Sequence, residues 1–129
     1  MRKWSIAVLC AFGLVPATAG ASTAPPLTGT YKVTIAGQAP PLDGTWQLKF
    51  LPAGAVNILR NGHVVVVGRA VVAGGRVTFS DRSGSYACPP PDATGRYSYK
   101  LTGRRLTFKP IADKCTGRRL ILTTKAFVK

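Results

Sequence analysis

The sequence contains no glutamate, only four aspartates and a single histidine, against 18 lysines and arginines. General acid–base catalysis commonly uses a histidine or a pair of neighbouring carboxylates. His63 lies beside a tight turn, and the aspartates are scattered through turn-like segments; they are Asp43, Asp81, Asp92 and Asp113. We therefore expect neither an enzyme nor a resident cofactor. No metal site is expected either, because the histidine and cysteine spacing fits no zinc pattern.

Long hydrophobic runs are also scarce, since only one is present, from Trp4 to Val15. It follows two basic residues and precedes a small-residue cleavage pattern near Ala19 or Ala21, as in a secretory signal peptide. The run is shorter than the roughly 20 apolar residues that a membrane span needs. We predict that residues 1–21 form a signal-peptide helix. The mature protein would then be secreted or periplasmic, with no transmembrane segment.

Cysteine is limited to three residues, and Cys10 would leave with the signal peptide. Cys88 and Cys115 would remain, and an even number of cysteines in an exported chain indicates a disulfide. The loop that this bond closes corresponds to a stabilisation of about 3–4 kcal/mol in the chain-entropy model. Because both thiols would be used, no cysteine nucleophile is expected.

The scarcity of acids leaves a strongly basic domain. Residues 22–28 are small, polar and proline-containing and are predicted to be a flexible leader, followed by one domain over residues 29–129. Without the two basic residues of the signal peptide, 16 basic residues stand against four acidic ones, a net charge of about +12. Such a surface favours anionic partners such as phosphate-bearing envelope polymers, anionic lipid or nucleic acid.

Helical periodicity is not seen in the mature chain, which alternates apolar and polar residues over short runs between glycine turns. This alternation is typical of half-buried strands, and Asn61-Gly62 is a strong hairpin signal. We predict an all-β fold of about eight strands, the last over residues 119–124, in an antiparallel up-and-down meander that closes into a small barrel. A two-sheet sandwich is the alternative. The inward-facing parity changes along the chain near Gly68, which predicts a β-bulge there.

Residues 95–109 form the most informative predicted hairpin, with Thr102 and Gly103 as its turn residues. The side chains predicted to point inward are Tyr97, Tyr99, Leu106 and Phe108. Those predicted to point outward are Arg96, Lys100, Arg105 and Lys109, with Ser98 and Thr107 between them. In this register Lys100 faces Arg105, and like charges directly opposite each other destabilise a sheet. The outer face is either a solvated basic surface or a site for an anionic partner.

The predicted barrel interior is rich in aromatic residues, and three functions are considered for it and for the surface. The predicted lining residues are Tyr31, Trp46, Phe50, Phe79, Tyr97, Tyr99 and Phe108. They would bind a small apolar or amphipathic molecule, unless they only fill the core, as is usual in small barrels. The alternative function is binding of an anionic envelope component or polymer to the outer basic face. Nucleic acid is disfavoured as that partner because no aromatic residues interleave with the face. A third function is inhibition of a secreted protease by the proline loop at residues 89–91.

Gly44-Thr45-Trp46, at the start of a predicted strand, resembles the glycine-x-tryptophan signature of lipocalins and other calycins. A wider set of residues is similar to small exported bacterial proteins of a lipocalin-like type. That set is Ser83-Gly84, Ala87-Cys88, Gly95-Arg96-Tyr97, Leu106, Asp113-Lys114-Cys115, Arg118 and Leu122. The resemblance implies a calycin-like barrel whose closed end carries an arginine stacked on Trp46. That arginine would be Arg118, with Arg119 as the other candidate.

Overall fold

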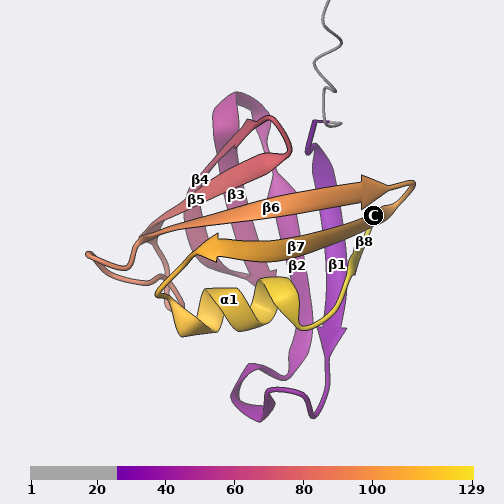
Figure 1. Cartoon of the computed structure of the whole chain (residues 1–129). Coiled ribbons are helices and arrows are strands. Elements are labelled where there is room, and N and C mark those ends of the chain that lie inside the picture. The colour runs from indigo at the N-terminus through magenta and orange to yellow at the C-terminus, as the bar shows by residue number, and fades with distance from the viewer. Residues whose placement is uncertain (1–25) are drawn as a thin grey trace, which may run out of the picture.

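The protein is a closed antiparallel barrel in which each strand pairs with the next along the chain (Figure 1). The computed structural model describes residues 26–129, so the predicted signal peptide, most of the leader and Cys10 lie outside the described residues. The strands are β1 (Gly29–Ile35), β2 (Gly44–Phe50), β3 (Ala55–Arg60), β4 (His63–Ala73), β5 (Arg76–Ser83), β6 (Thr94–Thr102), β7 (Arg105–Ala112) and β8 (Phe127–Val128). The helices are α1 (Thr116–Thr123) and the short 3₁₀ turns η1 (Pro40–Leu42) and η2 (Pro52–Gly54).

The short strand β8 closes the barrel. It pairs with β1 through Val128 and Lys32 and with β7 through Phe127 and Leu106. Every strand of the described sheet therefore has a neighbour on both sides, although β1 meets β8 at a single residue pair. The predicted barrel is confirmed, and the two-sheet sandwich is wrong.

Hairpin turns follow the glycine signals of the sequence. At Asn61-Gly62 both residues have positive φ, 49° and 84°, as a type I′ turn requires. The turn between β6 and β7, however, consists of Gly103 and Arg104, not of Thr102 and Gly103. Gly103 has a φ of 60°, so glycine occupies the first loop position, where a positive φ is needed.

This one-residue move of the turn shifts the cross-strand pairs by two residues and corrects the predicted register. Lys100 faces Thr107 and Thr102 faces Arg105, so Lys100 does not face Arg105. The observed register removes the repulsion between like charges that the predicted one contained. Because a shift of two preserves the side of each residue, the inward faces are as predicted. Tyr97, Tyr99, Leu106 and Phe108 are all buried.

The bulge predicted near Gly68 is confirmed by a register shift between Val67 and Gly68 in the β4–β5 ladder. A side chain at Gly68 would place its Cβ 2.4 Å from the backbone oxygen of Ser80, which explains the glycine. A second shift lies in the β3–β4 ladder, beside Val65 and Val66, which are both buried. The set of β4 residues that point inward therefore changes from odd to even positions at Val65 and Val66, before the chain reaches Gly68.

Residues 119–124 were expected to form a strand, but the chain from Thr116 to Thr123 is helix α1, which lies beside β7 in Figure 1. Its buried residues are Arg118, Ile121 and Leu122, at the i, i+3 and i+4 spacing of a helix face. The strand prediction was wrong because one member of this buried face is an arginine. A charged residue is not counted as part of an apolar stripe, so the helical spacing of this buried face could not be recognised in the sequence.

The barrel core is filled by aromatic rings. All seven predicted lining residues are buried, with at most 9% of each exposed. Four of them form a continuous row from Tyr31 through Phe50 and Phe79 to Phe108, with ring centroids 5.9 to 6.4 Å apart. Leu27, which belongs to the predicted flexible leader, is only 7% exposed and packs into the same core.

Candidate functional site

The outer face of the β6–β7 hairpin, called here the basic face, is the first candidate site. Arg96, Lys100, Arg105 and Lys109 are all exposed on it, as predicted. Within residues 26–129 both ion pairs are made by Arg118, so no carboxylate of the described chain pairs with these four cations. The basic face therefore presents positive charge that the described chain does not neutralise.

A shallow hollow of about 200 Å³ lies on the basic face. Its lining includes Ser98 and Lys100 from β6 and Thr107 and Lys109 from β7. The register pairs Ser98 with Lys109 and Lys100 with Thr107, so each ammonium group lies opposite a hydroxyl. This arrangement combines positive charge with neutral hydrogen-bond donors, which is what an anion with several oxygens needs.

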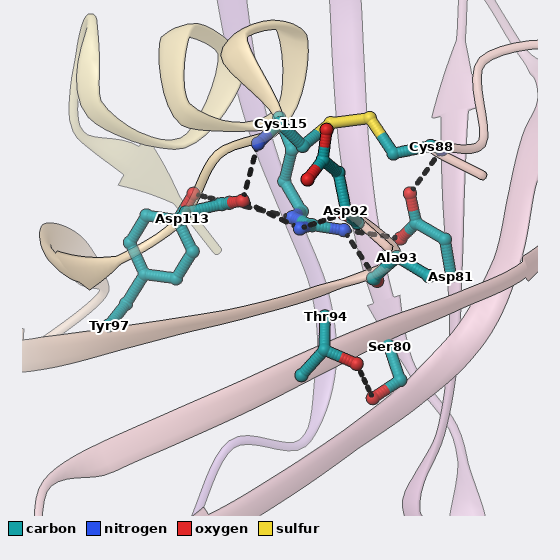
Figure 2. Close-up of polar contacts among 10 residues, drawn as sticks. Ser80, Asp81, Cys88, Asp92, Ala93, Thr94, Tyr97, Asp113 and Cys115 are labelled. Atoms are coloured by element: carbon teal, nitrogen blue, oxygen red, sulfur yellow. Dashed lines mark hydrogen bonds and ion pairs between the residues drawn. A yellow bond between two sulfur atoms is a disulfide. The ribbon is translucent and has the colours of Figure 1, made fainter. Parts of the chain in front are cut away.

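The second candidate is a buried polar cluster around Arg118, shown in Figure 2. Arg118 lies on α1 and is 4% exposed. Its guanidinium donates to both carboxylate oxygens of Asp113 at 2.7 Å and to the carbonyls of Ala93 at 2.9 Å and Asp92 at 3.0 Å. One terminal nitrogen also pairs with Asp81 at 3.2 Å. All five N–H donors of the arginine can therefore be used within the protein.

The two carboxylates of this cluster are held from other sides as well. Asp113 accepts hydrogen bonds from the hydroxyl of Tyr97 and from the backbone N–H of Cys115, the latter at 2.9 Å. Asp81 accepts one from the backbone N–H of Cys88 at 2.9 Å. The predicted disulfide between Cys88 and Cys115 is confirmed. The bond thus joins the two segments whose amides hold the carboxylates around Arg118.

Burial and hydrogen bonding shift the pKa values of Asp113, Arg118 and Tyr97 in this cluster. Burial raises the pKa of Asp113, but the hydrogen bonds from Arg118 and Tyr97 outweigh it and leave that pKa below its usual value. Burial lowers the pKa of Arg118, but the bond to Asp113 and the charge of Asp81 raise it overall. The pKa of Tyr97 is raised, first by burial and then by Asp113. Each of these three shifts moves the pKa of its group further from neutral pH.

Asp81, Cys88 and Cys115 place three metal-type ligand atoms within 4.8 Å of one another. The two sulfurs are bonded to each other, whereas a metal needs the thiolate form of cysteine. The oxidised protein therefore offers a lone carboxylate at this point, and that carboxylate is already bonded to Arg118.

The predicted stack of Arg118 on Trp46 is wrong. Arg60, at the end of β3, lies over the ring of Trp46 at 5.2 Å and over that of Tyr86 at 5.3 Å. Trp46 and Arg60 are direct cross-strand partners in the β2–β3 ladder, whereas Arg118 is held by its carboxylates and Arg119 is exposed on α1. A guanidinium does stack on the indole of Trp46, but it belongs to Arg60 on the neighbouring strand.

The third candidate is an open hollow of about 410 Å³, lined in part by Leu27, Phe50, Val72 and Tyr99. Only Phe50 and Tyr99 of the seven predicted lining residues contribute to it. Phe50 also belongs to the row of packed rings, so the hollow borders one part of the packed core and does not run through it.

Arg76, Arg60 and the cluster of Arg118 with Asp81 and Asp113 were not predicted by the sequence analysis. Arg76, at the start of β5, lies opposite Ser98 of β6 on the outer surface, and its place could be found only by knowing the β5–β6 register. Arg60 was likewise hidden, because its stacking depends on the pairing of β2 with β3. Gly95 belongs to the buried cluster as well, because a Cβ there would lie 2.4 Å from the carboxylate of Asp113.

Comparison of the chain with protein-family models, with curated proteins and with solved structures finds no match. A closed barrel alone does not identify a lipocalin-like family, so the resemblance to calycins stays a prediction, as do export and protease inhibition. None of the helices in the described part of the chain is long and apolar enough to cross a membrane.

Proposed function

We propose that the protein binds anionic polymers and that it does so with the basic face. The observation that carries this proposal is that Arg96, Lys100, Arg105 and Lys109 are exposed together without a carboxylate partner in the described chain. Binding of a polyanion to such a face releases the counterions that surround the polymer, which favours association.

The placement of the acidic residues supports this proposal. Two of the four aspartates, Asp81 and Asp113, have side chains that are 5% and 0% exposed and are paired with Arg118. Arg118 balances one of these two negative charges inside the protein, and neither carboxylate is exposed beside the cations of the basic face. A basic surface of this kind attracts polyanions over about a Debye length, roughly 8 Å at physiological salt.

Reversing two charges of the basic face tests the proposal. We expect Lys100→Glu with Arg105→Glu to weaken binding of long-chain inorganic polyphosphate by about tenfold or more and to lower the salt slope by about 2. Titrations by fluorescence anisotropy at several salt concentrations give both quantities. Both residues are exposed, so the fold should be retained.

A control with the same change in net charge is Lys32→Glu with Lys49→Glu, at two exposed positions on β1 and β2. We expect this variant to keep most of the affinity. If it loses as much as the first variant, net charge alone governs binding and the basic face has no special role.

As a second candidate function, we propose that the open hollow binds a small apolar or amphipathic molecule. Its volume of about 410 Å³ and its lining by Leu27, Phe50 and Tyr99 favour this proposal, since ligand pockets commonly measure about 300–1,000 Å³. Val72→Trp should fill the hollow and weaken binding of a fluorescent fatty acid about tenfold. Val71→Trp, on the opposite side of the same strand and 61% exposed, is the control. Equal binding by both variants would show that the hollow is not the site.

A further inference from the structure

Along the outer surface of β6 cationic and hydroxyl side chains alternate, and its central residues face the opposite kind of side chain on β5 and β7. The outward residues of β6 are Arg96, Ser98, Lys100 and Thr102. Its cation–hydroxyl pairs with β7 are Ser98 with Lys109, Lys100 with Thr107 and Thr102 with Arg105. Its cation–hydroxyl pairs with β5 are Arg76 with Ser98 and Thr78 with Arg96. The pattern ends at the start of β6, where Arg96 faces Ala112 of β7 and Thr94 faces Ser80 of β5.

Ser98 lies at the centre of this alternating surface. Arg76 is its partner on one side and Lys109 on the other, with neighbouring strands about 4.8 Å apart. Arg96 and Lys100 precede and follow it by two residues, about 6.7 Å along β6. Four exposed cations therefore surround one half-buried serine. Its hydroxyl has no hydrogen-bond partner among the described residues.

We propose that this arrangement is a binding site for a tetrahedral oxyanion, the phosphate or sulfate ester of a polymer, with Ser98 at its centre. The inference rests on the proposed function and names the ligand class of the basic face. It also extends that face to a third strand, because Arg76 comes from β5.

The donor set favours an ester over a carboxylate. A phosphate or sulfate ester presents at least two charged or strongly accepting oxygens and further ester oxygens in three dimensions, whereas a carboxylate has two oxygens in one plane. The guanidinium of Arg76 can donate two parallel hydrogen bonds, and the hydroxyl of Ser98 can donate to another oxygen. The ammonium groups of Lys100 and Lys109 add positive charge but, unlike a planar guanidinium, do not restrict the orientation of the bound group.

Thr107, like Ser98, is a hydroxyl residue with cations around it, and this second position favours a polymer as the ligand. Thr107 lies opposite Lys100, with Arg105 and Lys109 two residues to either side along β7. It is the diagonal neighbour of Ser98, about 8 Å away from strand spacings of about 4.8 and 6.7 Å. Ester groups on successive units of one chain could therefore occupy both positions.

The test compares three polymers: inorganic polyphosphate, dextran sulfate and poly-glutamate. We expect Arg76→Gln to weaken binding of polyphosphate, dextran sulfate or both by about tenfold and binding of poly-glutamate by less than about twofold. Ser98→Ala should weaken the same polymers about threefold, through the lost donor. The control Arg82→Gln removes an exposed arginine from the same strand, β5, and should have little effect on any of the three.

A loss confined to polyphosphate assigns the phosphate group as the ligand, and one confined to dextran sulfate assigns the sulfate ester. An equal loss for poly-glutamate, or the same loss in Arg82→Gln, would overturn the ester site. If Lys100→Glu with Arg105→Glu weakens polymer binding but Arg76→Gln and Ser98→Ala do not, the basic face binds polyanions and only the site around Ser98 is wrong. If none of these variants changes binding, the proposed function fails as well.

Discussion

Replacing Arg118 with methionine is expected to lower the free energy of unfolding by about 3–5 kcal/mol at neutral pH, because it leaves buried charges unpaired. Methionine roughly fills the space of the arginine stem but cannot donate to Asp113 or Asp81, whose side chains are 0% and 5% exposed. The carbonyls of Ala93 and Asp92 lose their donor at the same time. Urea denaturation followed by far-UV circular dichroism measures the difference.

Arg119→Met is the matched control, since Arg119 is the next residue of α1 and is exposed. Its free energy of unfolding should stay within about 0.5 kcal/mol of the wild-type value, as for most surface changes. A comparable loss in both variants would indicate that α1 is sensitive to any substitution, and not that the buried cluster is broken.

The contribution of Asp113 to the pH dependence of stability should differ between the wild type and Arg118→Met. In the wild type the pKa of Asp113 lies below its unfolded value of about 3.9, so its contribution to stability is present above that value and is lost as the pH falls. In Arg118→Met burial still raises the pKa of Asp113, the guanidinium no longer lowers it, and only the hydrogen bonds from Tyr97 and Cys115 oppose the effect of burial. The folded-state pKa of Asp113 is then higher than in the wild type, so protonation of Asp113 costs the variant less stability. The stability gap should therefore narrow as the pH falls below about 4, and a constant gap would contradict the electrostatic explanation.

The faces of the strands could be predicted from the sequence, because alternation determines which side of a strand is apolar. Tyr97, Tyr99, Leu106 and Phe108 are buried as expected. The register of their hairpin could not be predicted, since Thr102-Gly103 and Gly103-Arg104 are both plausible turn sequences. The choice between them depends on cross-strand partners such as Lys100 and Thr107.

The candidate site was only partly predictable for a related reason. The four cations of the basic face belong to one hairpin, so local alternation is enough to gather them. Arg76 joins them, and Arg60 reaches Trp46, through pairing between whole strands. The buried role of Arg118 was hidden because a charged residue is expected at the surface, and only its aspartates and carbonyls make burial acceptable.

Removing the disulfide is expected to lower the free energy of unfolding by about 3–4 kcal/mol in the chain-entropy model, since Cys88 and Cys115 are 27 residues apart. The double variant Cys88→Ala with Cys115→Ala avoids free thiols, and urea denaturation under the same conditions gives the difference. Mixing a reductant with the wild type should reproduce the loss. An effect well below 1 kcal/mol would mean that the unfolded chain is already restricted near these residues.

Combining this variant with Arg118→Met separates two contributions of the disulfide. Restriction of the unfolded chain is independent of Arg118, so it should simply add to the cost of the methionine. The backbone N–H groups of Cys88 and Cys115 also hold Asp81 and Asp113 in place around the guanidinium. Either change alone already removes the stabilisation that comes from holding these carboxylates around the guanidinium. We therefore expect the loss of stability in the combined variant to be smaller than the sum of the two separate losses by about 0.5–3 kcal/mol. Strict additivity would show that the disulfide acts on the unfolded chain alone.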